Sequence, residues 1–153
     1  MQICQASTLD EIAVVRTLFQ EYAAWLRIDL CFQGFAAELA SLPGLYALPR
    51  GRLLLASVGG EALGCVALRS VGGTVCEMKR LFVRPAFQGR GSGRRLAEMV
   101  IAEARTIGYS TMTLDTLPFM HAAIRLYETL GFVRRPAYYA TPLQETIFME
   151  LQL

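Results

Sequence analysis

A cluster of glycines and arginines lies in the stretch RPAFQGRGSGRRLAEMVIAEA at residues 84–104. Gly89, Gly91 and Gly93 stand where the apolar spacing predicts the start of a helix, although glycine costs a helix about 1 kcal/mol relative to alanine. Backbone N–H groups in a loop without Cβ atoms approach a ligand closely, and the positive end of a helix dipole favours an anion. Residues 78–97 contain six Lys and Arg residues and no acidic one. These features predict a site for a phosphate-bearing ligand, although a tight strand-to-helix turn with a solvated basic face would use the same residues.

The common phosphate-binding motifs do not fit this stretch. A P-loop, G-x-x-x-x-G-K-S/T, needs lysine and a hydroxyl residue after Gly93, where the chain has Arg94 and Arg95. The dinucleotide fingerprint G-x-G-x-x-G needs glycine where Arg94 stands. What remains is QGRGSG at residues 88–93, after the strand-like segment RLFVRPAF.

QGRGSG resembles the acyl-coenzyme-A-binding motif of the GNAT superfamily of N-acetyltransferases, Q/R-x-x-G-x-G/A between a strand and a helix. The segment AAIRLYETLGF at residues 122–132 resembles the second signature of that superfamily, A-x-x-L-Y-x-x-x-G-F, about 35 residues later. The resemblance covers roughly residues 52–151 and implies a GNAT-like acyl-CoA N-acyltransferase fold. It also implies an enzyme that uses acetyl-CoA as co-substrate, without a metal.

The resemblance also assigns the cofactor contacts. A strand that splays from its neighbour would bind the pantetheine arm and the thioester through the backbone of Leu81, Phe82 and Val83. The pyrophosphate would lie against the amides of the following loop, which are those of Gln88, Gly89, Arg90, Gly91, Ser92, Gly93 and Arg94.

Acetyl transfer from a thioester to an amine needs a base for the ammonium proton, donors for the developing oxyanion and an acid for the thiolate. Glu77 lies eleven residues before Gln88, the spacing of the catalytic glutamate in family members that resemble histone acetyltransferases, where it acts through water. We therefore predict Glu77 as the base. A salt bridge to Lys79, Arg80 or Arg52 is the other interpretation of this acidic residue.

Two further residues carry predicted roles in the chemistry. Tyr127 occupies the tyrosine of the second signature, which in the family often donates a proton to the thiolate, so we predict it as the acid; a core aromatic residue is the alternative. Asp115, at the end of a predicted strand, is a second candidate base or a cap of the next helix. The oxyanion donor would be a backbone N–H near Phe82 or Val83.

One position departs from the family pattern. Many members carry Asn seven residues before the tyrosine, in contact with the cofactor, whereas this chain has Met120. The only histidine, His121, follows it and could replace the polar contact or lie on the surface.

The acceptor side is less defined. In the family it is formed by the first helix, the loop after it and the C-terminal hairpin, which here contain aromatic and acidic residues: Tyr22, Trp25, Phe32, Phe35, Tyr138, Tyr139, Glu21, Asp29 and Glu38. We expect a small-molecule amine as acceptor, because no long acidic or peptide-binding tract is present. A regulatory module that binds acyl-CoA without turnover is the alternative function.

The elements that would position these residues follow from periodicity and turn signals. Apolar residues at helical spacing predict a helix over about 8–26, opened by a Ser7-x-x-Asp10 capping box. The order β–α–(α)–β–β–β–α–β–α–β–β indicates an α+β fold in which helices flank a mixed sheet. Its later members are a short helix in FAAELASL, a hairpin at Gly59-Gly60, strand 74–83, helix 91–107, strand 110–115, a helix in PFMHAAIRLYETLG with Pro118 near its first turn, and strands in FVRR and ETIFMEL.

Size and composition set the remaining expectations. The 153 residues, 54% of them apolar, predict a single domain over residues 1–153. A net charge of +2 gives no reason to expect a nucleic-acid partner, and no apolar run has the length of a membrane span. Four scattered cysteines favour reduced thiols in a cytoplasmic protein rather than a metal site. Family members are often dimers, and the apolar segment TIFMEL offers an edge for a homodimer.

Overall fold

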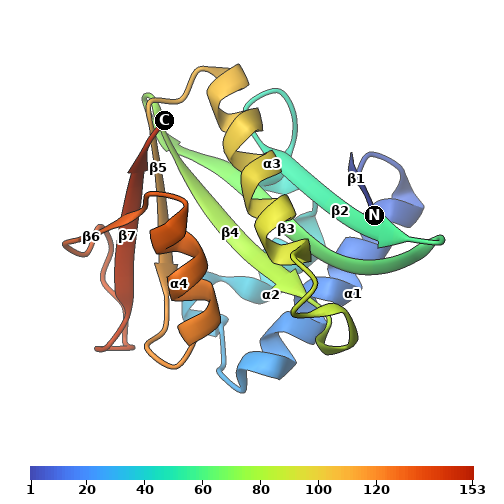
Figure 1. The fold of residues 1–153 in the computed structure, drawn as a ribbon, viewed down its shortest axis with the longest axis horizontal. Coiled ribbons are helices and arrows are strands. Elements are labelled where there is room, and N and C mark those ends of the chain that lie inside the picture. Colours follow the sequence, from blue (N-terminus) through green and yellow to red (C-terminus); the bar gives the residue numbers. More distant parts are fainter.

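A seven-stranded sheet in the order β1-β2-β3-β4-β5-β7-β6 forms the centre of the molecule (Figure 1). The computed structural model describes the backbone of all 153 residues and every side chain except that of Phe32. Strands β4 and β5 are parallel, and every other neighbouring pair is antiparallel. The sheet is therefore mixed, as predicted. Its strands are β1 (Gln2–Gln5), β2 (Arg52–Val58), β3 (Glu61–Gly72), β4 (Val75–Val83), β5 (Thr111–Thr116), β6 (Val133–Arg135) and β7 (Ile147–Gln152).

Helices cover both faces of this sheet. Helices α3 (Ser92–Ile107) and α4 (His121–Thr129) lie on the face nearer the viewer in Figure 1, and α1 (Leu9–Leu26) and α2 (Phe35–Ser41) lie behind it. Two apolar clusters fill the layers: Leu96 and Val100 of α3 pack on one face, and Val15 and Phe19 of α1 on the other. Three short 3-10 turns join these parts: η1 (Cys31–Gln33), η2 (Gly44–Tyr46) and η3 (Pro85–Phe87). Among the described residues, none of the helices has the length and apolar character needed to cross a bilayer.

The predicted capping residues of α1 are wrong, although the helix starts within one residue of its expected bound. Its capping box is made by Thr8 and Glu11 rather than by Ser7 and Asp10. Pro118 lies near the first turn of α4, as predicted, but ahead of the helix, because the Met120 N–H donates to the carbonyl of Leu117 (3.0 Å) and closes a turn first.

Strand β4 contains a β-bulge at the middle of the sheet. The register with β3 shifts so that Val66 alone lies opposite both Arg80 and Leu81. Arg80 has φ of 59°, the left-handed region that a side chain with a Cβ rarely adopts. A bulge bends its strand and redirects the side chains around it. Here it changes the course of β4 at the point where the strand leaves β5.

The pairing of β4 with β5 is short. Only Val75–Glu77 pair with Thr111–Thr113, although β4 runs on to Val83 and β5 to Thr116. The two strands therefore diverge beyond Glu77, as the resemblance implies, and the β5-facing edge of β4 is left without a strand partner in the described structure. This short pairing, which we call the seam, joins β1–β4 to the half-sheet β5-β7-β6.

Candidate active site

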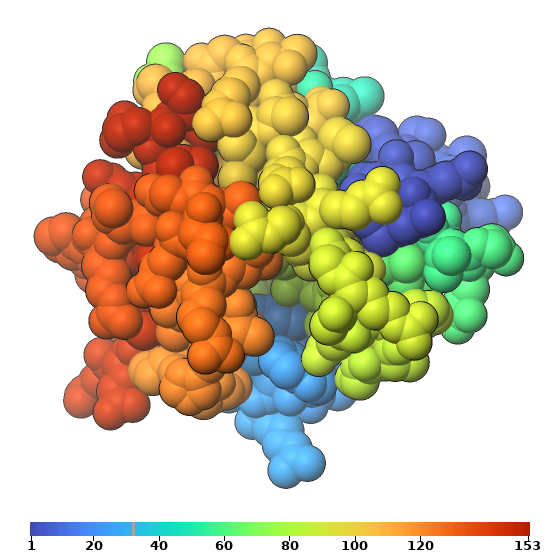
Figure 2. Space-filling model, viewed as in Figure 1, coloured from blue at the N-terminus to red at the C-terminus, as the bar shows by residue number. Residues whose placement is uncertain are grey.

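A cleft of about 500 Å³ opens where the two strands diverge. Its floor is the end of β4, and its walls are the loop that leads into α3 and the first turns of α4. Figure 2 shows this hollow between α4 (orange) and the yellow-green loop. The cleft contains eight of the ten predicted cofactor residues: Leu81, Phe82, Val83, Gln88, Gly89, Gly91, Ser92 and Gly93.

The start of α3 presents free backbone donors to this cleft. Gly91 is the N-cap with φ of 78°, and Gly89 has φ of 74°, so both need the left-handed conformation that glycine adopts without strain. No described side chain caps the helix. The first N–H groups of a helix have no partner within it. They are therefore available to an anion in the cleft.

Arg90 and Arg94 were also predicted as cofactor residues. Only their backbones take part in the turn before and at the start of α3, because their side chains contact other residues. The guanidinium of Arg90 lies over the ring of Phe87 at 6.0 Å. That of Arg94 donates to the hydroxyl of Thr129 (2.6 Å) and lies 3.6 Å from Glu98. Neither side chain lines the cleft.

Several cleft residues lie outside the predicted motif contacts, among them His121, which the sequence offered as a replacement for the family asparagine. Trp25, Phe119, Met120, His121 and Arg125 all line the cleft. His121 and Arg125 lie four residues apart on α4, so both reach the same face of that helix. The four-residue spacing is visible in the sequence, but the sequence does not show that this face of the helix borders a cleft. The cleft lining contains these two basic residues and no carboxylate among the described residues.

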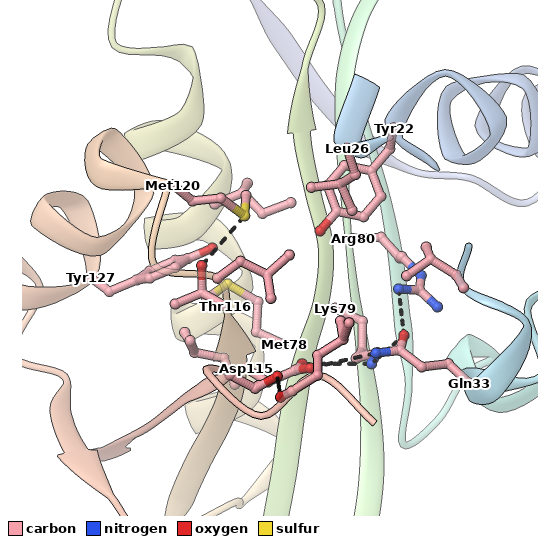
Figure 3. Close-up of a pocket in the computed structure, with 16 residues that line it drawn as sticks. Tyr22, Leu26, Gln33, Met78, Lys79, Arg80, Asp115, Thr116, Met120 and Tyr127 are labelled. Carbon is pink, nitrogen blue, oxygen red and sulfur yellow. Dashed lines mark hydrogen bonds and ion pairs between the residues drawn. The ribbon is translucent and has the colours of Figure 1, made fainter. Parts of the chain in front are cut away.

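A smaller cavity of about 50 Å³ adjoins the cleft between the diverging strands, and we call it the inner cavity. It shares Leu81 and Met120 with the cleft. Figure 3 shows Tyr127 reaching it from α4, on one side of β4, and Tyr22 from α1 on the other. The inner cavity thus connects elements from both faces of the sheet.

Tyr127 is buried, with 6% of its surface exposed. No solvent-inaccessible side-chain N or O atom of the described residues lacks a partner, so its hydroxyl, which makes no hydrogen bond to them, is open to the cavity. Burial raises its pKa above the ordinary value of 10.0. The phenol is therefore protonated at neutral pH and can act as a proton donor. Tyr22 lines the same cavity, and burial raises its pKa to about 12.

Glu77, the predicted base, is enclosed by partners. Its side chain is 1% exposed and forms an ion pair with Arg69 at 2.7 Å, instead of with Lys79, Arg80 or Arg52. Its other carboxylate oxygen accepts a hydrogen bond from the hydroxyl of Tyr138 (2.5 Å). Glu77 does not line the inner cavity.

Asp115 lines the inner cavity together with Tyr127 and does not cap α4, whose N-cap is Met120. One of its oxygens accepts hydrogen bonds from the Tyr139 hydroxyl (2.5 Å) and, at 3.5 Å, from the amide of Gln33. Its other oxygen lies 3.7 Å from the Lys79 ammonium. Asp115 is thus the one carboxylate among the described residues that line the inner cavity.

The remaining predicted acceptor residues divide into several groups. Tyr139 and Glu38 line a neighbouring pocket. Glu21 pairs with Arg84 (2.8 Å), and Asp29 accepts from the backbone of Cys31 (2.9 Å). Phe35 packs under the guanidinium of Arg80, and the side chain of Phe32 lies outside the described residues.

No group of three or more His, Cys, Asp and Glu side chains in the described part could hold a metal.

Comparison with known proteins gives one consistent result. The model of the Acetyltransferase (GNAT) family matches residues 16–132. An uncharacterized N-acetyltransferase of Schizosaccharomyces pombe is 41% identical over 140 residues, which cover 90% of this chain and 86% of that protein. An IAA acetyltransferase of Azospirillum brasilense is 38% identical over 112 residues, or 70% of this chain and 71% of that protein.

Solved structures agree with the sequence matches. A candidate acyl-CoA N-acyltransferase of Klebsiella pneumoniae superposes with a TM-score of 0.78 at 28% identity, covering 99% of this chain and 97% of that one. A Salmonella typhimurium structure with acetyl-CoA superposes with a TM-score of 0.68 over 99% of this chain and 93% of that one; at 23% identity it bears on the fold alone. The glycine loop at α3, the diverging strands and the tyrosine of α4 thus lie in a chain that belongs to the GNAT family of N-acetyltransferases.

Proposed function

We propose that residues 1–153 form one domain that transfers the acetyl group of acetyl-CoA to the primary amine of a small-molecule acceptor, by direct transfer while both are bound. The observation that carries this proposal is that the cleft and the inner cavity adjoin and share Leu81 and Met120 in their lining. A thioester lying along β4 would reach Tyr127 and Asp115 at its inner end.

The residues of the cleft fit acetyl-CoA. The free N–H groups at the start of α3 suit a pyrophosphate, and the absence of a carboxylate from the described lining removes a source of repulsion. Gln88 holds the loop against the strand, because its side-chain amide donates to the carbonyl of Val83 (2.8 Å). His121 and Arg125 offer polar contacts on α4 in place of the asparagine that many family members carry.

The chemistry would divide between two side chains. Acetyl-CoA supplies the thioester, whose C–S bond breaks as the new C–N bond forms. Asp115 would take the proton that the acceptor ammonium must lose before attack, and Tyr127 would give its proton to the departing sulfur. The second proton that the nitrogen loses as the amide forms would return to the Tyr127 phenolate and restore the phenol. A backbone N–H near Phe82 or Val83 would stabilise the charge on the carbonyl oxygen.

The role of Glu77 stays a prediction. Its spacing before Gln88 favours a base that acts through water, whereas the Arg69 and Tyr138 contacts occupy both of its carboxylate oxygens. Asp115 faces the cavity directly. We therefore give Asp115 the direct proton transfer and propose that Glu77 acts through Tyr138 or water.

The test combines binding with turnover. Acetyl-CoA at 100 times its Kd should stabilise the protein by about 2.7 kcal/mol, measured as a rise in melting temperature. A panel of amines, followed by release of free thiol, should reveal turnover. Asp115→Asn should lower kcat by about 10²-fold or more. If that loss appears in Glu77→Gln and not in Asp115→Asn, Glu77 is the residue that takes the proton directly. An absent thermal shift at millimolar acetyl-CoA would contradict the proposed function.

A further inference from the structure

A second pocket, which we call the cationic pocket, adjoins the inner cavity on the side away from the cleft. It encloses about 230 Å³ and shares Gln33, Lys79 and Arg80 with the inner cavity. Figure 3 shows Gln33, Lys79 and Arg80 on the side of β4 opposite Tyr127. A ligand that places one end beside Asp115 could therefore extend into this pocket.

The lining of the cationic pocket carries an excess of positive charge. Arg69, Lys79 and Arg80 line it, and Glu38 is the single carboxylate among its described lining residues. The carboxylate of Glu38 is already used: Arg80 donates to both of its oxygens (3.0 and 3.2 Å), and Tyr46 donates to one of them (2.7 Å). Arg69 forms an ion pair with Glu77, which lies outside the lining of the pocket.

Lys79 is the incompletely partnered cation of the three. It is 7% exposed, and among the described residues its ammonium makes one hydrogen bond, to the side-chain oxygen of Gln33 at 3.3 Å. Asp115 lies 3.7 Å away, beyond hydrogen-bond distance. An ammonium has three donors, and a buried charge is costly unless it is paired and hydrogen-bonded. A carboxylate in the cationic pocket would satisfy the remaining donors.

We infer that the acceptor is an amino carboxylate, such as an amino acid, whose carboxylate binds Lys79 beside Arg69 while its amine lies in the inner cavity next to Asp115. This inference rests on the proposed function and narrows its acceptor class. Charge-assisted hydrogen bonds from Lys79 would orient the acceptor, and the opposite charge at its other end would match Asp115.

Matched acceptor pairs test the inference. Each amino acid of a panel, both α- and ω-amino carboxylates, is compared with its uncharged amide, since the two differ at the carboxylate alone. We expect kcat/KM to be at least about tenfold higher for the acid of the preferred pair. Lys79→Met should raise KM for that acid by about tenfold or more, with a smaller change in kcat, and leave the KM of the amide nearly unchanged. Arg105→Gln, on the exposed side of α3, is the control for loss of a positive charge.

Failure of this inference can be distinguished from failure of the proposed function. Transfer to amides and acids alike, or an equal effect of Lys79→Met on both, would overturn the amino-carboxylate class and leave acetyl transfer in place. If no amine is acetylated, succinate and hexanoate, which lack an amine, serve as binding probes for the acetyl-CoA-saturated protein. Thermal stabilisation by these probes in the wild type, reduced in both Lys79→Met and Arg69→Gln, supports the pocket. Absence of that stabilisation overturns the inference.

Discussion

At the scale of single residues, the inner cavity is defined by side chains that are buried without being fully bonded. The hydroxyl of Tyr127 is without a partner in the described structure, and Lys79 has one hydrogen bond where it could make three. A protein core normally satisfies such groups internally. Here the unused donors all face one cavity, which is what a site for a polar ligand requires.

Tyr127→Phe should lower kcat by about 10²- to 10³-fold, because the change removes the proposed proton donor for the thiolate and nothing else. The melting temperature should stay nearly the same, since the hydroxyl makes no hydrogen bond with the described residues. Steady-state kinetics with a thiol reagent and a thermal melt provide the two measurements. An undiminished kcat would place the acid elsewhere, with Tyr22 the next residue to test.

Lys79 should make stability depend on pH. Burial lowers its pKa below 10.5; Arg80 and Arg69 add to this effect, and Asp115 and Glu77 oppose it. Between the lowered native pKa and 10.5, the unfolded state binds more protons, so the free energy of unfolding of the wild type rises with pH. Lys79→Met lacks this titration. The stability of Lys79→Met relative to that of the wild type, which we call the margin, should therefore fall as the pH rises from the native pKa toward 10.5.

Urea denaturation of the ligand-free wild type and Lys79→Met, at pH 7 and again near pH 10.5, measures that margin. Titrating groups that do not interact with Lys79 cancel in the difference between the two proteins. A margin that stays constant or grows with pH would show that Lys79 is not the group responsible.

The positions of residues in the site were predictable where a motif fixes the local backbone. Gly89, Gly91 and Tyr127 follow from short-range spacing, and the structure places them in the cleft and the inner cavity. The partner of Glu77 was not predictable, because Arg69 comes beside it through the antiparallel register of β3 with β4. Periodicity indicates a strand but does not say which residue of the next strand lies opposite.

At the scale of elements, the bulge in β4 and the start of α3 position the site together. Arg80 occupies the bulge in a left-handed conformation and ties it to α2 through Glu38. That ion pair is largely buried. Arg80 also donates a hydrogen bond to the side-chain oxygen of Gln33, and this contact fixes where η1 and Gln33 lie over the cationic pocket. The site therefore depends on an unusual conformation in a strand as much as on the glycine loop.

Gly91→Ala should destabilise the protein by about 1–2 kcal/mol, because a φ of 78° at the N-cap is unfavourable for a residue with a Cβ. It should also weaken acetyl-CoA binding, since the strained cap shifts the first N–H groups of α3. Urea denaturation measures the first effect and ligand titration the second.

Gly93→Ala is the matched control for stability. Gly93 lies within α3, and a Cβ there would come only to 3.9 Å from Val83. Helix propensity then favours alanine by about 1 kcal/mol, so this variant should be no less stable than the wild type. Equal destabilisation of both variants would contradict the argument from φ.

The elements themselves were largely predictable, because each has a strong periodic pattern. Helices over 8–26 and 91–107 and the strands around 74–83 and 110–115 appear within one or two residues of their expected bounds. The start of α4 was missed, since a turn stabilised by Met120 precedes it. The bulge was also missed, because nothing in MKRLFV differs from an ordinary strand until its pairing with β3 is known.

At the scale of the whole molecule, the sheet consists of two parts joined by the seam of Val75–Glu77 with Thr111–Thr113. The loop before α3 belongs to one part and α4 to the other, and both border the cleft. A ligand in the cleft therefore contacts both parts. The free energy of its binding should stabilise the whole sheet.

Amide hydrogen exchange measures this coupling. Acetyl-CoA should slow exchange in β2 and β3 on one side of the seam and in β7 on the other, although these strands do not border the cleft. Gly91→Ala at the same acetyl-CoA concentration should show a smaller effect. Protection confined to β4 and the α3 loop would mean that binding is local.

The divergence of β4 from β5 also bears on which acyl donors the enzyme can use. A strand edge exposes a row of main-chain donors and acceptors, and in an interior position these need a partner other than water. Beyond Glu77 that partner is missing from the protein itself. A thioester whose arm carries amide groups could complete the sheet as an additional strand would, whereas a simple alkyl thioester has no groups to offer and would be a poor donor however reactive its carbonyl.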